Sequence, residues 1–260
     1  MNVQALSKTV RNPLAVSDAE WNARVELAAA YRIMGHFGHC DLAQNHLCLR
    51  VPGEPDGFLN NAADDFFEEV TASTLCKFDF EGNPRQEGVP KLRGGGLIIH
   101  AGLLAARPDL NATIHSHTPA IMGVASQKKG LLPINQHAMH FMGNIVYHEF
   151  GGFEFDMRQR APLIRDLGDK KIALLRNHGS LVCGTTIGGA MVAHNQLEVA
   201  CQGQIAALSA GEGEVVLVSK ESQEYARKQA ETLSAGRDDG GKDWKGMLRM
   251  ADRLFPDYRN

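Results

Sequence analysis

Asn111-Ala-Thr-Ile-His115-Ser-His117-Thr-Pro119 is the stretch on which the interpretation of this sequence depends. Its apolar start predicts the end of a short buried strand, and Pro119 predicts the start of a helix or turn. Two histidines separated by one residue on an extended backbone project to the same face, so both imidazoles can bind one divalent cation. On spacing alone, an ordinary surface or core pair is as common as a metal site.

A third histidine stands in a matching context. His178 follows the apolar run 172–175, which predicts a second buried strand, and it precedes Gly179 in a turn. Because α/β proteins build their sites where strands end, we expect His115, His117 and His178 to meet at one edge of a sheet. The sequence therefore predicts a site for one divalent transition metal, with Zn, Mn or Fe as candidates.

The composition is that of an ordinary globular protein. The chain has 260 residues, of which 43% are hydrophobic and 22% are charged, enough for one large domain or one domain with a terminal appendage. A net charge of -3 provides no basic field for nucleic acid or an anionic membrane, so small molecules are the expected partners. Five widely spaced cysteines favour reduced thiols over a disulfide framework.

No targeting segment is expected. Residues 1–13 lack the apolar core of a signal peptide, and no stretch reaches the ~20 apolar residues of a membrane span. These features predict a soluble cytoplasmic protein.

Hydrophobic patterns predict an alternation of strands and helices. Ser17 can cap a first helix that ends near Gly35. Strands are expected at 46–50, 57–60, 75–80, 172–175 and 181–183. Further helices are expected at 64–70, 97–106, 119–126, 163–167, 186–210, 219–233 and 244–254. Without internal repeats, this alternation predicts a sheet sandwiched by helices.

The ordered motifs resemble the class II aldolase/adducin family, in particular its adducin-like bacterial branch. The resemblance is carried by 94–118, by Arg176-Asn-His178-Gly and by the long helix that follows, and it extends from about residue 20 to 235. It implies an α/β fold, a three-layer α/β/α single domain around a mixed, largely antiparallel sheet. It also implies that His115, His117 and His178 ligate the metal, and that the protein is a homotetramer with intersubunit active sites.

The resemblance divides the chain into an N-terminal extension (1–16), the aldolase/adducin-like domain (17–235) and a C-terminal helical tail (236–260). Apolar residues of the tail are expected to contact a neighbouring subunit. They are Trp244, Leu248 and Phe255.

Three departures from the sugar-phosphate aldolases of the family affect the expected reaction. Gly96 stands where those enzymes have an acid/base Glu, and His46 stands where they have a substrate-contacting Asn. Their phosphate-holding Ser-Gly is absent near 58–61. The usual proton-abstracting carboxylate is thus missing, which disfavours a sugar phosphate as substrate. The bacterial branch instead resembles metal-dependent decarboxylases of hydroxylated aromatic or pyridine carboxylic acids.

The expected activity is therefore that of a metal-dependent lyase acting on a small-molecule carboxylate, most simply a decarboxylase. A bound metal stabilises the enolate-like charge that remains when a carbon-carbon bond breaks. Three alternatives stay open: a class II aldolase for a small hydroxy-keto acid, an Fe(II)-dependent oxygenase, and a non-catalytic adducin-like interaction domain.

Candidate residues for these reactions fall into two groups. Proton transfer is assigned to His46, His137 or Tyr147, although single buried histidines are often only hydrogen-bonded. Substrate binding is assigned to Arg93 and Arg176, as carboxylate partners, and to Gly96, where a glycine allows close backbone approach. The remaining histidines, including His148, are interpreted as strand, surface or structural residues.

Overall fold

A seven-stranded sheet runs through the chain in the order β3-β2-β1-β4-β7-β6-β5. The computed structural model describes residues 12–234 and 238–260, so 1–11 of the predicted N-terminal extension and the start of the predicted tail lie outside the described residues. Neighbouring strands are antiparallel except for the parallel pair β5 and β6. The strands are β1 (His46–Arg50), β2 (Gly57–Asn60), β3 (Cys76–Asp79), β4 (Ala112–Ser116), β5 (Ile145–His148), β6 (Ile172–Leu175) and β7 (Gly179–Gly184). The predicted mixed, largely antiparallel sheet is confirmed.

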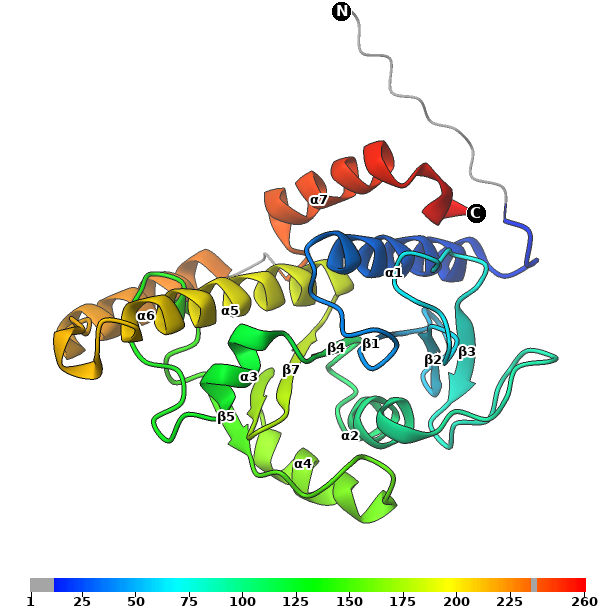
Figure 1. Cartoon of the computed structure of the whole chain (residues 1–260). Coiled ribbons are helices and arrows are strands. Elements are labelled where there is room, and N and C mark those ends of the chain that lie inside the picture. The colour runs from blue at the N-terminus through cyan, green and yellow to red at the C-terminus, as the bar shows by residue number, and fades with distance from the viewer. Residues whose placement is uncertain (1–11, 235–237) are drawn as a thin grey trace, which may run out of the picture.

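Helices cover both faces of this sheet, which gives three layers (Figure 1). One layer contains α1 (Asp18–His36), α3 (Pro119–Ala125), α5 (Ile187–Leu208) and α7 (Gly241–Leu254). The other layer contains the π-helix η1 (Gly96–Ala101), its continuation α2 (Gly102–Ala106), and α4 (Arg160–Leu167). Helix α6 (Lys220–Ser234) and the short 3₁₀ helices η2 (Ala138–His140), η3 (Met157–Gln159), η4 (Glu212–Glu214) and η5 (Pro256–Arg259) complete the described elements.

The strands contribute side chains to two hydrophobic clusters, because successive side chains of a strand point to opposite faces. In β6, Ile172 and Leu174 join the cluster under α1, α3 and α5, whereas Ala173 and Leu175 join the cluster under α2 and α4. The continuous apolar run that predicted this strand is thus explained by burial on both faces.

Ser17 begins the first helix as predicted. The Ser17 hydroxyl accepts a hydrogen bond from the backbone N–H of Glu20 at 3.1 Å. This bond satisfies one of the free N–H groups in the first turn of α1. The helix then ends at His36, close to the predicted end near Gly35.

The structure corrects three expectations. The helix predicted at 64–70 is wrong, because this segment forms turns. The helix predicted at 97–106 begins as the π-helix η1. The Trp244 side chain is not available to contact a neighbouring subunit, because it is buried within its own chain against Gly188 at the start of α5. Across the described residues, we find no helix with both the length and the apolar character to span a membrane.

Candidate metal centre

The sheet brings the three predicted metal ligands to the ends of its central strands. His115 lies in β4, and His117 follows this strand by one residue. His178 lies in the turn between β6 and β7, after Asn177, whose positive φ of 57° an asparagine adopts more readily than most residues. Because β4 pairs with β7, the turn places His178 beside the two other histidines.

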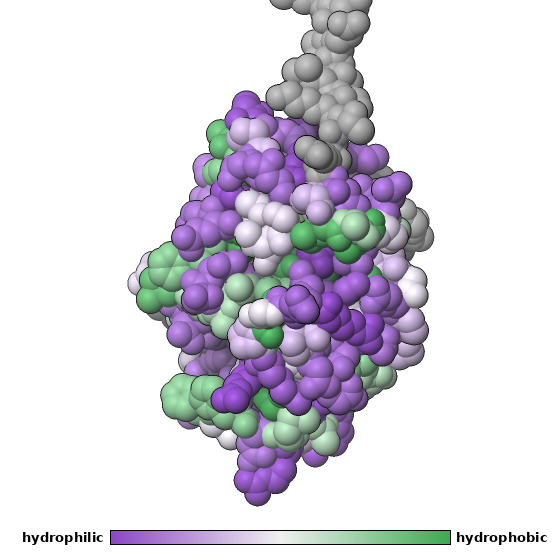
Figure 2. All heavy atoms as spheres, turned by 90° about the vertical axis from the view of Figure 1, so that its right-hand side faces the viewer, coloured by the Kyte–Doolittle hydropathy of each residue, from purple (hydrophilic) through white to green (hydrophobic). Residues whose placement is uncertain are grey.

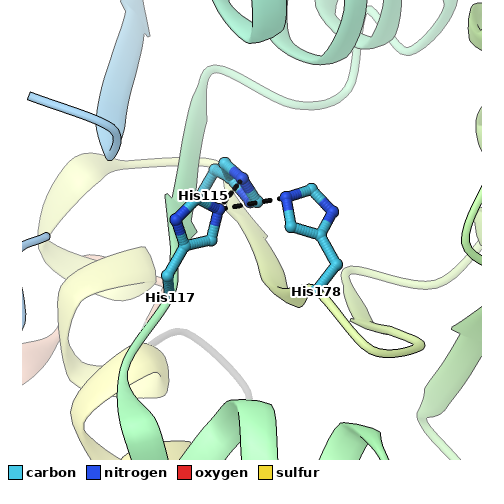
Figure 3. Close-up of side chains that lie close together, drawn as sticks. All are labelled: His115, His117 and His178. Atoms are coloured by element: carbon cyan, nitrogen blue, oxygen red, sulfur yellow. Dashed lines mark hydrogen bonds between the residues drawn. The ribbon is translucent and has the colours of Figure 1, made fainter. Parts of the chain in front are cut away.

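The three Nε2 atoms converge on one point (Figure 3). His117 Nε2 lies 2.9 Å from His115 Nε2 and 3.0 Å from His178 Nε2. The three side chains offer one nitrogen each within 4.8 Å of one another, and His115 is fully buried while the other two are partly exposed. Converging imidazole nitrogens of this kind are a donor set that divalent transition metals bind.

The opposite ring nitrogen of each histidine faces an oxygen. His115 Nδ1 lies 2.8 Å from the backbone carbonyl of Ser180. His117 Nδ1 lies 3.3 Å from a carboxylate oxygen of Asp41, and His178 Nδ1 lies 3.3 Å from a carboxylate oxygen of Glu154. Acceptors at Nδ1 favour the tautomer whose proton is on Nδ1, which leaves the Nε2 lone pair for a metal.

The environment of His115 and His178 disfavours their protonated forms. Burial lowers the pKa of His115 well below its usual value, and the neighbouring His46 adds to the effect. Burial and the nearby His117 lower the pKa of His178 to about 4. At these distances the Nε2 atoms either share a proton in a hydrogen bond or present lone pairs to one another, and a divalent cation between them relieves the repulsion of the lone pairs. The residues therefore fit a bound divalent metal, held by His115, His117 and His178.

The triad opens into a cavity of about 520 Å³. Of the predicted substrate and catalytic residues, His46, Arg93 and Gly96 line this cavity together with the triad. Arg93 is exposed, and no hydrogen bond or ion pair of its guanidinium is found within 12–234 and 238–260.

His46 is the end of a buried hydrogen-bond chain. Its Nδ1 lies 2.6 Å from His100 Nε2, and His100 Nδ1 lies 2.5 Å from the hydroxyl of Thr113. The Nε2 of His46 faces Gly95 so closely that a Cβ at this glycine would lie 2.6 Å away. Burial lowers the pKa of both imidazoles, that of His100 to about 3, so the pair is neutral at pH 7.

Comparison with known proteins agrees with this architecture. The family model of the Class II Aldolase and Adducin N-terminal domain matches residues 25–205. The chain belongs to the class II aldolase/adducin family. An aldolase II superfamily protein from Pseudomonas syringae has a crystal structure that matches with a TM-score of 0.89 and 39% identity, over 95% of this chain and 98% of that protein.

Two further relatives show the breadth of the class II aldolase/adducin family. The structure of L-fuculose 1-phosphate aldolase from Glaciozyma antarctica matches with a TM-score of 0.80 and 25% identity, over 96% of this chain and 98% of that protein. Alpha-adducin of Rattus norvegicus is 32% identical over 93% of this chain, which spans 34% of that longer protein. Membership of this family therefore does not by itself define the activity of the present chain.

The remaining predicted site residues do not line the triad cavity of their own chain. The Tyr147 hydroxyl accepts a hydrogen bond from the backbone N–H of Leu131 at 2.9 Å. The Arg176 guanidinium lies over the Tyr147 ring and donates to the backbone carbonyls of Ala125 and Gln127. Nη1 of Arg176 thus holds the loop after α3, while the residue lines a neighbouring cavity that also contains His178, so its assignment to substrate stays a prediction. His137 occupies the N-cap position of η2 without a side-chain capping hydrogen bond, and it also lies outside the cavity.

The structure adds carboxylates that sequence reasoning missed. Asp41 and Glu154 belong to loops distant in sequence from the histidines they face, so no local pattern marks them. Burial raises the pKa of Glu154. Its neighbours Phe153 and Phe155 are 78% and 81% exposed, so Glu154 lies on a loop with an apolar surface.

A second cavity of about 530 Å³ adjoins the first, sharing Phe150, Glu154 and His178 with it. It contains His148, whose Nδ1 lies 2.7 Å from the carboxylate of Asp166. The interpretation of His148 as an ordinary strand or surface residue is incomplete, since it is an oriented imidazole beside the metal centre.

Proposed function

We propose that this protein is a metal-dependent carbon-carbon lyase that decarboxylates a hydroxylated aromatic or heteroaromatic carboxylic acid, or a related hydroxy acid. One observation carries the proposal: the three histidines converge in a cavity that is lined at position 96 by a glycine, so this position provides no carboxylate. A Cβ at Gly96 would lie 2.9 Å from Leu92 Cδ1. The site therefore retains the metal ligands of the family without the acid/base Glu of its sugar-phosphate aldolases.

The chemistry of decarboxylation fits these residues. A divalent metal, when bound by the triad, supplies Lewis-acid stabilisation of the charge that develops on the substrate. Loss of carbon dioxide leaves the bonding electron pair on the substrate, so this cleavage requires a proton donor afterwards but no base beforehand. An aldol donor must instead be deprotonated, for which position 96 provides no group.

Two residues of the cavity are assigned to the substrate. Arg93 is the proposed partner of the substrate carboxylate, because it lines the cavity and no hydrogen bond or ion pair of its guanidinium is found among the described residues. His46 is the proposed proton carrier, because it lines the cavity, its Nδ1 is fixed by His100, and no hydrogen bond of its Nε2 is found among the described residues.

A substrate panel tests the proposal. We expect carbon dioxide release from 2-hydroxybenzoates and hydroxypyridine carboxylates to exceed aldehyde release from fuculose and rhamnulose phosphates by at least ~100-fold, in parallel assays with Zn, Mn, Co and Fe(II). Gly96→Glu should not restore sugar-phosphate cleavage. Turnover of the sugar phosphates alone would refute the decarboxylase, and turnover that requires both Fe(II) and oxygen would replace it with an oxygenase.

A class II aldolase acting on a small hydroxy-keto acid is the second candidate. Glu154 favours it, because this half-buried carboxylate lines the cavity in which the usual Glu is missing. The relative from Glaciozyma antarctica is named as an aldolase. Glu154→Gln separates the two reactions when the panel is run at saturating metal, because Glu154 also faces the ligand His178. An aldolase that relies on this carboxylate would then lose cleavage, while a decarboxylase would retain it.

We also propose a homotetramer with sites between subunits. Figure 2 shows a face of the molecule that is mostly hydrophilic with separate hydrophobic patches. Exposed apolar side chains do lie beside the cavity, on the loop that carries Phe150, Phe153 and Phe155. In such an assembly, a catalytic role of His137 or Tyr147 would be exerted in a neighbouring subunit.

Multi-angle light scattering tests this assembly. At micromolar protein concentration we expect a mass about four times that of the 28.3 kDa chain. Phe153→Ser with Phe155→Ser should lower the mass, whereas Val216→Ser, at an 86% exposed residue far from this loop in sequence, should not. A monomer in the unmodified protein would contradict both the assembly and the shared site.

A further inference from the structure

The side chain of Asn45 is buried beside the metal centre without a hydrogen-bond partner. Asn45 is 1% exposed, and it lies among the residues that line the triad cavity. Within the described part of the chain, neither its Nδ2 nor its Oδ1 has a partner. Buried polar groups are almost always hydrogen-bonded, so an amide with both ends unpaired calls for a specific reason.

Other asparagines of the same cavity do not share this property. Asn60 donates its Nδ2 to the sulfur of Cys48 at 3.0 Å. Asn61 accepts the hydroxyl of Tyr31 at 2.8 Å through its Oδ1. Both of these amides are therefore used by the fold, whereas the amide of Asn45 is not.

The loop that carries Asn45 is tied to the metal centre at both ends. Asp41 faces His117 through its carboxylate, and His46, the next residue after Asn45, pairs with His115 across β1 and β4. Between them Leu42 adopts a positive φ of 47°, a costly conformation for a leucine. The backbone of Asn45 is thus held in a fixed position relative to the triad.

We propose that Asn45 is a specificity-determining residue whose amide binds a polar group of the substrate that is not bound to the metal. An amide pairs fully only with a group that both donates and accepts hydrogen bonds, such as a hydroxyl or an uncharged carboxyl. A phosphate dianion offers acceptors alone and would leave Oδ1 unpaired. The claim that the substrate also binds the metal rests on the proposed function. The claim that the Asn45 amide binds a ligand does not depend on it.

The first test measures thermal stability without ligand. In Asn45→Leu an apolar side chain of similar size replaces an unpaired buried amide, so we expect Tm to rise by about 2–4 °C. The matched control, Asn61→Leu, removes an amide that the fold uses, and its Tm should fall. A fall in Tm for Asn45→Leu would overturn the proposal, because it would show that the amide is satisfied within the fold.

The second test measures ligand selectivity by calorimetry on the zinc-loaded protein. The probes are 2-hydroxybenzoate, 2,4-dihydroxybenzoate and 2,5-dihydroxybenzoate, which share one metal-binding end. We expect one dihydroxybenzoate to bind the unmodified protein about tenfold more tightly than 2-hydroxybenzoate. Asn45→Leu should abolish this preference while changing the Kd of 2-hydroxybenzoate less than about twofold.

The outcomes separate this inference from the proposed function. An unchanged preference in Asn45→Leu would overturn the role of Asn45 even if decarboxylation is observed. If none of the benzoates binds, hydroxybenzoates are not the substrates, and the thermal test alone then decides whether the Asn45 amide is left unpaired by the fold.

Discussion

His115→Ala is expected to reduce bound zinc from about one ion per chain to almost none after dialysis. The substitution removes one of three ligands and leaves the Ser180 carbonyl without its donor. Loss of an outer contact of a metal ligand typically weakens affinity 10–100-fold, so loss of the ligand itself should weaken it on the order of 1000-fold. Elemental analysis of protein dialysed against zinc at fixed pH gives the measurement.

The matched control for this experiment is His140→Ala. His140 is exposed and lies outside the triad cavity, so its removal tests whether histidine loss in general changes zinc content. Circular dichroism should show that both variants are folded. Equal zinc in the unmodified protein and in His115→Ala would show that the three histidines do not form the metal site.

The triad was predictable because its geometry is local. Residues separated by two positions in a strand project to one face whatever the rest of the fold does, which places His115 and His117 together. His178 required only the expectation that a second buried strand ends at the same edge. The register of β4 against β7 confirms this expectation, since Ser116 pairs with Ser180, two residues beyond His178.

The outer contacts were not predictable, because long-range packing creates them. Asp41 reaches His117 from 76 residues away. Arg176 was predicted to bind a substrate carboxylate, and the sequence does not reveal that its guanidinium also lies over Tyr147 and holds the loop after α3. Arginine patterns alone do not distinguish a structural donor from a binding one.

The element predictions failed where tertiary contacts override local preference. The segment at 64–70 has helix-forming acidic residues, yet it forms turns. Phe67 in this segment is fully buried, and its ring packs edge-on against Tyr31 of α1 with ring centroids 4.8 Å apart. Packing of one aromatic anchor therefore outweighs the weak helical propensity of a short segment.

Gly179→Ala is expected to destabilise the protein and to disrupt the metal centre together. A Cβ at Gly179 would lie 2.2 Å from the backbone oxygen of Ser116 and 3.0 Å from Cδ2 of His117. The oxygen belongs to β4, which the ladder to β7 holds in place, so β7 must move. An overpacked site costs about 3 kcal/mol at the upper end of the usual range, which corresponds to a fall in Tm of roughly 6–12 °C.

Zinc affinity distinguishes this effect from simple loss of stability. Gly179 lies between His178 and Ser180, and the Ser180 carbonyl faces His115. A shift of β7 therefore moves His178, and also the carbonyl that orients His115, relative to His117. Zinc titrations well below the Tm of each variant should show at least ~10-fold weaker binding for Gly179→Ala. Gly213→Ala is the control, since a Cβ at that glycine meets no atom within 4 Å. If Gly179→Ala keeps its Tm within about 1 °C and binds zinc like the unmodified protein, the close approach of β4 and β7 is not what positions the three histidines.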